Sequence, residues 1–410
     1  MLSSLFAKRR TACPYCYQDL DVNQVAFRCS GMGAPGRPAC EPAPDPKRRQ
    51  LFNDTEPVLP AIRKGAVPQQ GAAGSPAESA DLLGRESVTC GDCGGQSGVR
   101  LCPACHSLLP RSLANDSPLF GLVGAPNSGK TVLLSRLHKE LTSSVARRFD
   151  ASIVAPGGES GFAGELARYE EEMSKGRGEL PQKTGKTGAK KKPPAVYEWK
   201  YRRGRTTSAT IFSFYDSAGE DVSRQEETMK QQYLGQSSGI ILLLDPFSFP
   251  ENIARAEQRG ANPEADSDLP ESVLNGITYV LQTAHSIKRS KRIRVPLAVV
   301  ISKIDAFLDQ VPQHHPLRKP GGTDGVFDEA ESQDNHEHIK SMVERWGGDG
   351  LLRKLEHEYA NYRLFGVSAL GAEPDYRART VNARGVLPHR VPDPLLWLMA
   401  TRGFIPSNGK

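Results

Sequence analysis

The sequence lacks the features of a membrane or secreted protein. Its apolar runs, such as Ile240–Leu244, are far shorter than the roughly 20 apolar residues of a membrane-spanning helix. The N-terminal stretch MLSSLFAKRR places apolar residues before its charges and no apolar segment after them, which is the wrong order for a secretion signal. We therefore expect a cytoplasmic protein without a membrane partner, in which cysteine thiols stay reduced.

Aromatic side chains are scarce, and cysteine is absent after Cys105. Aromatic residues make up 7% of the 410 residues, while 39 glycines and 31 prolines predict much loop around a modest core. A chain of this length can bury one sizeable core and a smaller module. The formal net charge of +6 is a mild excess, so it does not distinguish a nucleic-acid partner from a solvated surface.

The eight cysteines follow two spacings. These are C-x2-C-x12-C-x10-C, with Cys13, Cys16, Cys29 and Cys40, and C-x2-C-x8-C-x2-C, with Cys90, Cys93, Cys102 and Cys105. Tight Cys-x-x-Cys turns aim both thiolates at one tetrahedral ion, so we predict two structural zinc ions. The pairing stays open, because the first and last Cys-x-x-Cys pairs can share an ion. Redox chemistry is the weaker alternative, since no thioredoxin-like βαβ pattern surrounds any pair.

We expect this zinc-ribbon-like module over residues 1–110, with a flexible insert rich in Pro, Ala and Gly at about 41–87. Such modules bind proteins or nucleic acid. Basic residues that would suit phosphates lie nearby: Arg9, Arg10, Lys47, Arg48 and Arg49.

Residues 118–405 alternate apolar strand patterns with longer helical patterns. The expected strands are 119–124, 196–201, 210–215, 239–245, 296–302 and 363–368, and the expected helices are 131–147, 222–234, 271–289, 332–346 and 393–402. This order predicts an α/β protein with a mostly parallel six-stranded sheet covered by helices on both faces, as in P-loop NTPases. A turn at 202–205 predicts one antiparallel hairpin, and inserts are expected at about 175–194 and 309–331.

The stretch GAPNSGKT fits G-x-x-x-x-G-K-[ST] directly after a predicted strand. Glycines at both ends let the backbone curl, so that its N–H groups and the following helix N-terminus face phosphate oxygens. Lys130 would neutralise the outer phosphates and Thr131 would coordinate Mg²⁺. The predicted nucleotide ligands here are Gly124, Asn127, Ser128, Gly129, Lys130 and Thr131.

The stretch YDSAGED follows the third predicted strand, where a second metal-side element belongs. Asp216 would hold the magnesium through water, and the Gly219 N–H would face the terminal phosphate. Glu220 stands where many nucleotide switches have Gln.

The stretch SKID, residues 302–305, indicates guanine. The Lys303 stem would lie along the base, and Asp305 would accept from a ring N–H and an amine that adenine does not present together. Ser302 replaces the usual Asn or Thr, and its hydroxyl could still bridge back to the phosphate loop. Ser368 and Ala369 follow the last predicted strand, where the Ala369 N–H would reach the guanine oxygen.

In this order the elements resemble the GTPase superclass of translation factors and Ras-like switches. The cysteine-rich head, the long insert before the hairpin and the Asp-x-Ala-Gly-Glu sequence resemble the bacterial double-GTPase (DO-GTPase) group, in particular its second family. The resemblance implies GTP, GDP and Mg²⁺ as ligands. It also implies a larger protein partner or second GTPase subunit within multi-gene bacterial defence or conflict systems. LPQKT resembles the group's first switch, which makes Thr184 the threonine that closes over the magnesium.

Catalysis is expected to involve Lys130, Thr184 and Glu220. A glutamine orients the attacking water by donating and accepting, whereas a carboxylate only accepts and is repelled by the phosphate. We therefore expect a slow GTPase that depends on a partner. The alternatives are a non-hydrolysing GTP-bound scaffold and, less favoured, a nucleic-acid-binding zinc protein regulated by nucleotide.

Overall fold

The computed structural model describes residues 10–22, 24–63, 79–80, 86–114, 118–124, 128–156, 161–175, 178–181, 194–203, 206–214, 233–259, 269–288, 290–375 and 378–409. Among these residues, no helix is both long and apolar enough to cross a bilayer.

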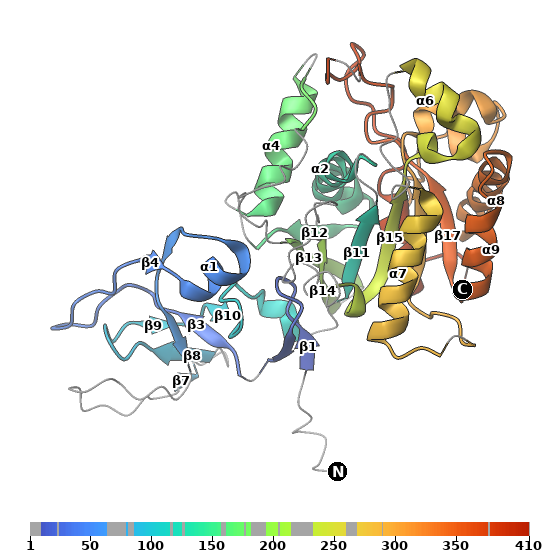
Figure 1. The fold of residues 1–410 in the computed structure, drawn as a ribbon. Helices are drawn as coiled ribbons and strands as arrows, with labels where there is room; N and C mark the ends of the chain where they lie inside the picture. Colours follow the sequence, from blue (N-terminus) through green and yellow to red (C-terminus); the bar gives the residue numbers. More distant parts are fainter. Residues whose placement is uncertain are drawn as a thin grey trace.

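A four-stranded parallel sheet forms the centre of the α/β domain (Figure 1). Its strands lie in the order β11 (Leu119–Gly124), β15 (Ser237–Leu244), β16 (Leu297–Ile301) and β17 (Tyr362–Gly366). These strands are apolar at almost every position because helices cover both faces of the sheet. All four carboxyl ends therefore lie at the same edge, where α/β proteins bind ligands.

Helices divide the core into two parts. On one face, α7 (Pro270–Ala284), α8 (Glu329–Arg345) and α9 (Asp349–Glu358) pack against alternate strand residues such as Leu242 and Leu244. On the other face, α2 (Lys130–Glu140) and α10 (Asp393–Thr401) pack against Ile241 and Leu243. Successive side chains of a strand point to opposite faces of the sheet, so neighbouring strand residues contact different helices. A short helix, α6 (Ile253–Arg259), follows β15.

The predicted hairpin is present but belongs to a separate antiparallel sheet. This sheet has the order β12 (Ala151–Val154), β13 (Ala195–Arg203) and β14 (Thr206–Phe214). β14 lies beside β11, with the Phe120 and Phe212 ring centres 6.2 Å apart. In the described part of the chain, however, the two strands are not joined by a ladder of backbone hydrogen bonds. The six expected strands are all present, and β12 is an additional one.

Tyr233 explains why β11 and β14 do not pair through their backbones in the described part of the chain. Its hydroxyl accepts from the Leu122 N–H at 2.7 Å and donates to the Phe120 carbonyl at 2.8 Å. A parallel partner strand would use this same carbonyl and N–H, two residues apart. The tyrosine hydroxyl therefore satisfies backbone groups of β11 that a neighbouring strand would otherwise pair.

The cysteine module, residues 10–114, lies beside the antiparallel strands (Figure 1). Its elements are β1 (Arg10–Ala12), β2 (Asp19–Asp21), β3 (Ala26–Arg28), β4 (Ala43–Pro44), α1 (Pro46–Phe52), β5 (Pro57–Val58), β6 (Ala61–Arg63), β7 (Ser79–Ala80), β8 (Glu86–Thr89), β9 (Gln96–Ser97) and β10 (Arg100–Leu101). Regular structure over residues 43–63 corrects the expected flexible insert, which was placed from residue 41. The local reason is a helix cap: the Asp45 carboxylate accepts from the Lys47 and Arg48 N–H groups.

Buried contacts fix the segment 309–331, which was predicted as an insert and whose last residues, 329–331, begin α8. It contains the end of a 3₁₀ helix, Ile304–Gln310, and a second one, Pro316–Arg318. Arg390, only 6% exposed, donates to the carbonyls of Pro316 and Lys319 and pairs with Asp393 at 2.8 Å. One buried guanidinium therefore anchors the insert.

A buried histidine of α8, His336, should make the stability of the fold sensitive to acid. Its Nδ1 accepts from the Leu364 N–H of edge strand β17 at 3.0 Å, which requires a neutral ring. Burial lowers the pKa of His336 to about 4. The unfolded chain therefore takes up this proton first, so the free energy of unfolding falls by about 2–3 kcal/mol as the pH drops from 6.5 to 4.

Urea unfolding of the full chain at several pH values measures this loss. We expect His336→Gln, which can still accept from Leu364, to show a weaker pH dependence than the wild type. His357→Gln, at an exposed position of α9, is the matched control and should behave like the wild type. Equal slopes for all three chains would contradict this account.

Candidate nucleotide and zinc sites

The predicted phosphate loop lies at the carboxyl end of β11 and leads into α2. Gly129 has φ +88°, a left-handed conformation that favours glycine. A Cβ at Gly124 would lie 2.6 Å from the Leu243 carbonyl oxygen, so this position also requires glycine. The first turn of α2 contains no acidic residue and has no side-chain cap, which leaves its positive end suited to an anion.

The predicted phosphate ligands gather around this turn. The Lys130 ammonium donates to the Gly124 carbonyl at 2.8 Å, so its side chain turns back toward the carboxyl end of β11. Ser128 is fully buried, and Thr131 is half-buried in the first turn of α2. The remaining predicted residues of the phosphate and magnesium side lie outside the described residues: Asn127, Thr184, Asp216, Gly219 and Glu220.

The predicted base-binding residues meet at the carboxyl ends of β16 and β17. The Ile304 N–H donates to the Val367 carbonyl at 3.1 Å, which joins the SKID turn to the Ser368–Ala369 segment. Ser368 is 1% exposed and its hydroxyl accepts from the Gly371 N–H at 2.7 Å, while Ala369 is half-buried beside it. Asp305 is half-buried in the first turn of a 3₁₀ helix. The structure thus brings these predicted residues together.

Ser302 makes a contact that the sequence did not predict. Both its N–H and its hydroxyl donate to the Leu244 carbonyl, at 2.9 and 3.0 Å. The hydroxyl therefore joins β16 to β15. Residues 125–127 of the phosphate loop lie outside the described residues, so the expected bridge from Ser302 to this loop stays a prediction.

Sequence reasoning missed Asp245, the residue that follows β15. Its carboxylate pairs with the Lys303 ammonium across the strand ends. The available signal was an acidic residue directly after an apolar strand. Leu244 pairs with Ile301 in the ladder, so Asp245 lies one position and Lys303 two positions beyond the last pair of these parallel strands. The predicted strand 239–245 included Asp245 as its last residue.

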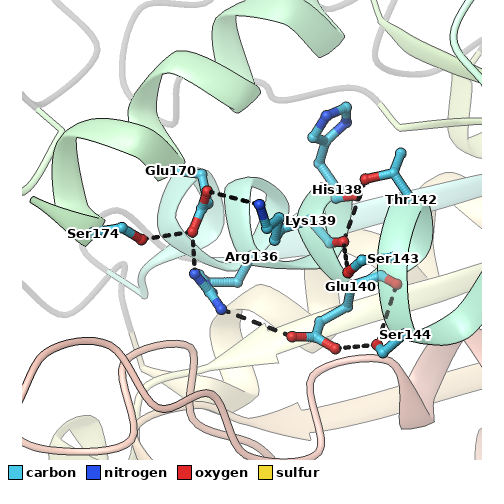
Figure 2. A network of polar contacts seen from close by, with 9 residues as sticks. All are labelled: Arg136, His138, Lys139, Glu140, Thr142, Ser143, Ser144, Glu170 and Ser174. Atoms are coloured by element: carbon cyan, nitrogen blue, oxygen red, sulfur yellow. Dashed lines mark hydrogen bonds and ion pairs between the residues drawn. The ribbon is translucent and has the colours of Figure 1, made fainter.

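A polar network fixes α2 to α4 (Phe162–Ser174), as Figure 2 shows. Arg136 of α2 and Glu170 of α4, 6% and 7% exposed, form a buried ion pair. The Ser174 hydroxyl donates to Glu170 at 2.7 Å, and Glu140 lies 3.7 Å from the other nitrogen of Arg136. Removing one partner of such a pair leaves an uncompensated buried charge. The helix that begins at the phosphate loop is therefore joined to the helix that leads into the 175–194 insert.

The cysteines form two groups in the crossed arrangement. Cys13, Cys16, Cys102 and Cys105 make the first group, and Cys29, Cys40, Cys90 and Cys93 make the second. Each group thus combines an N-terminal pair with a pair from the other end of the module. The pairing of β3 with β10 brings the first and last parts of the module together, so that cysteines from both parts can share an ion.

Both groups fit zinc. In each, the four Sγ atoms lie within 4.8 Å of one another, and two Sγ–Sγ distances in each group lie between 3.4 Å and 3.9 Å. A tetrahedral Zn–S distance of about 2.3 Å places sulfurs about 3.8 Å apart. Backbone N–H groups of Gly31, Gly95 and Ala104 donate to cysteine sulfurs at 3.3–3.4 Å. Burial raises the pKa of the Cys13 and Cys105 thiols, so a cation is needed to hold them as thiolates.

The first cysteine group is also part of the junction with the α/β domain. Its sulfurs pack in one apolar cluster with Val196 of β13 and Ile211 of β14. Tyr17, directly after Cys16, packs against Tyr233 with the two rings tilted by 46° and their centres 4.7 Å apart. Within the described residues, the apolar cluster of the second group contains Leu59 and Ile62, both from the same module.

Several basic residues of the module are used internally. Lys47 donates to the Pro103 carbonyl, Arg48 pairs with Asp54, and Arg28 donates to the His106 carbonyl at 3.3 Å. The Lys47 contact joins α1 to the last cysteine pair, and the Arg28 contact joins β3 to the residue that follows this pair. Lys47 and Arg48, expected to suit phosphates, are therefore committed to the fold.

The family model described as Double-GTPase 2 matches residues 119–372, which is more than half of the chain. The chain belongs to the Double-GTPase 2 family. The match begins at β11 and ends just beyond the Ser368–Ala369 segment, so it spans the phosphate loop and the SKID turn of this Double-GTPase 2 protein. The predicted resemblance is confirmed.

One curated relative is SaeC of Mycolicibacterium smegmatis, whose name assigns it to ESX-1 scaffolding and assembly. It is 27% identical over 334 residues, covering 75% of this chain and 80% of SaeC. Among solved structures, Sup35 complexed with GDP is 11% identical with a TM-score of 0.25, covering 64% of this chain and 40% of Sup35. The GTP-bound GTPase-like domain of S. cerevisiae Ski7 is 12% identical with a TM-score of 0.29, covering 64% and 46%. The chain spans less than half of either solved protein, and scores this low carry no argument.

Proposed function

We propose that this Double-GTPase 2 protein is a guanine-nucleotide switch that hydrolyses GTP slowly and depends on a partner for faster turnover. The observation that carries the proposal is the shared sheet edge. The phosphate loop follows β11 and the SKID turn follows β16, so two predicted nucleotide-binding segments distant in sequence face one region. Family membership supports guanine nucleotide as the ligand.

Each predicted residue has a defined task in this proposal. Lys130 and the α2 N-terminus bind the phosphates, while Thr131 and Asp216 hold Mg²⁺, which would neutralise charge on the phosphates. Gly219 and Thr184 contact the terminal phosphate and the magnesium. Lys303, Asp305 and the Ala369 N–H select guanine. The cysteine groups hold one Zn²⁺ each, which stabilises a module too small for a core of its own. A cytoplasmic setting, where thiols stay reduced, would suit them.

The partner is proposed to be a protein, either a second GTPase subunit or part of a larger assembly. The name of the relative SaeC supports a scaffolding or assembly role. That name also favours the second candidate function, a GTP-bound scaffold that does not hydrolyse. A role in a bacterial conflict system, implied by the resemblance, stays a prediction. Nucleic acid is less favoured as a partner, since Lys47 and Arg48 are occupied within the module.

Single-turnover phosphate release from GTP separates the switch from the scaffold. We expect slow release by the wild type and release roughly tenfold faster by Glu220→Gln, because an amide both donates to and accepts from water. Tight GTP binding with no phosphate release in either chain would contradict the switch and favour the scaffold.

A further inference from the structure

The ends of β15 and β16 are joined more tightly than the ladder between the strands requires. The Leu244 carbonyl accepts from both the N–H and the hydroxyl of Ser302. One residue further along, the Asp245 carboxylate accepts from the Lys303 ammonium. Because the Ser302 hydroxyl is used on β15, the described contacts of this serine do not orient the Lys303 side chain.

The Asp245 carboxylate is held in a fixed orientation. Its Oδ1 accepts from the Phe247 N–H at 3.0 Å and caps the 3₁₀ helix Pro246–Ser248. The Ser248 hydroxyl donates to the Asp245 carbonyl at 2.7 Å, and Asn252 donates to the Pro246 carbonyl at 2.9 Å. The second carboxylate oxygen, Oδ2, therefore faces Lys303 from a rigid turn.

Lys303 needs such a partner. It has φ +51°, a strained conformation for a residue with a side chain, and its side chain is 23% exposed. A lysine stem has several rotatable bonds and loses much entropy when it is fixed. Here the ammonium is held by Asp245 and lies 5.7 Å from the ring centre of Phe247, which is 2% exposed. That ring packs on Phe307 at 5.3 Å, so the surface beneath the ammonium is also fixed.

We propose that Asp245 is a positioning residue of the guanine site: it holds the Lys303 ammonium so that the stem is pre-ordered for the base. The inference rests on the proposed function. Asp245 would act through Lys303 and not through the phosphates. It should therefore change affinity for GDP and GTP by the same factor, because pre-ordering one long side chain before binding favours both complexes equally.

The test uses the full-length, zinc-loaded chain and direct titration with GDP and GTP. Asp245→Asn keeps an oxygen for the Phe247 N–H but removes the charge that holds Lys303. We expect about tenfold weaker binding of both nucleotides. In a Lys303→Met background, where the stem remains and the ammonium is gone, Asp245→Asn should have no further effect. Asp245→Ser, which can also cap the turn, serves if the Asn variant does not fold.

Asp309→Asn is the matched control. Asp309 is a nearby carboxylate that pairs with Arg255 at 3.3 Å but lies away from Lys303, with a side chain 66% exposed. We expect unchanged affinity for both nucleotides. Unchanged affinity in Asp245→Asn, or an equal loss in the Lys303→Met background, would overturn the inference while leaving the proposed function standing. A wild type that binds no guanine nucleotide would overturn both.

Discussion

Replacing Lys130 by Ala is expected to weaken GTP binding by about 100-fold. The ammonium would supply charge-assisted hydrogen bonds to the outer phosphates, and bonds of this kind contribute about 1.5–3 kcal/mol. In the structure the Lys130 ammonium lies 2.8 Å from the Gly124 carbonyl, at the end of β11 where the phosphate loop begins. Titration with a fluorescent GTP analogue measures the loss.

The control for this variant lies on the same helix. Lys139→Ala removes the same functional group from α2, at a side chain 55% exposed that lies 3.9 Å from Glu170. We expect its GTP affinity to stay within about twofold of the wild type, since exposed ion pairs contribute little. Equal losses in the two variants would mean that Lys130 acts through helix stability and does not bind phosphate.

Disrupting the first cysteine group is expected to have the largest effect on stability. Cys102→Ser removes one ligand of a fully buried group that packs against β13 and β14. A structural zinc site contributes about 10 kcal/mol or more to folding, so loss of one thiolate should cost on the order of 5 kcal/mol. The destabilisation should reach the α/β domain through the junction, because Tyr17, which follows Cys16, packs against Tyr233, and the Tyr233 hydroxyl is hydrogen-bonded to the backbone of β11. We expect the α/β domain to unfold at a lower temperature as well.

Cys40→Ser is the matched variant in the second group. Cys40 is partly exposed, and in the described part of the chain its group packs with Leu59 and Ile62 of the same module. We expect this variant also to lose one zinc ion by metal analysis, while the α/β domain keeps its unfolding temperature. Calorimetry with zinc analysis on both variants decides the question. Equal effects on the α/β domain, or a wild type containing no zinc, would contradict the assignment.

Much of the fold could be predicted because its strands are buried on both faces. A continuous apolar run such as 119–124 then predicts a strand in the sequence even though it shows no alternation of apolar and polar residues. β11 has these same bounds. β12 was missed because its residues are alternately half-buried and exposed, so it contains no apolar run. α4 was missed for a different reason. It begins after Gly161 without a side-chain cap, so the usual start signal is absent.

The site was predictable as far as strand ends are concerned. Since the ends of parallel strands meet at one edge, motifs after β11, β16 and β17 had to converge. Contacts between side chains were harder to predict from the sequence. Cysteine spacing shows which thiols form a turn but not which turns meet, because that depends on how β3 and β10 pair. Asp245 was missed because an acid after an apolar strand shows its role only when its partner, Lys303, is in view.

The central claim is that the phosphate loop and the SKID turn bind one guanine nucleotide. Isothermal titration of the zinc-loaded, nucleotide-free chain with GDP and ADP in Mg²⁺ tests it most directly. We predict binding of GDP at least about 100-fold tighter than ADP, since a site built to hydrogen-bond the guanine edge leaves polar groups unpaired against adenine. No heat with GDP, or equal affinity for the two nucleotides, would contradict the account.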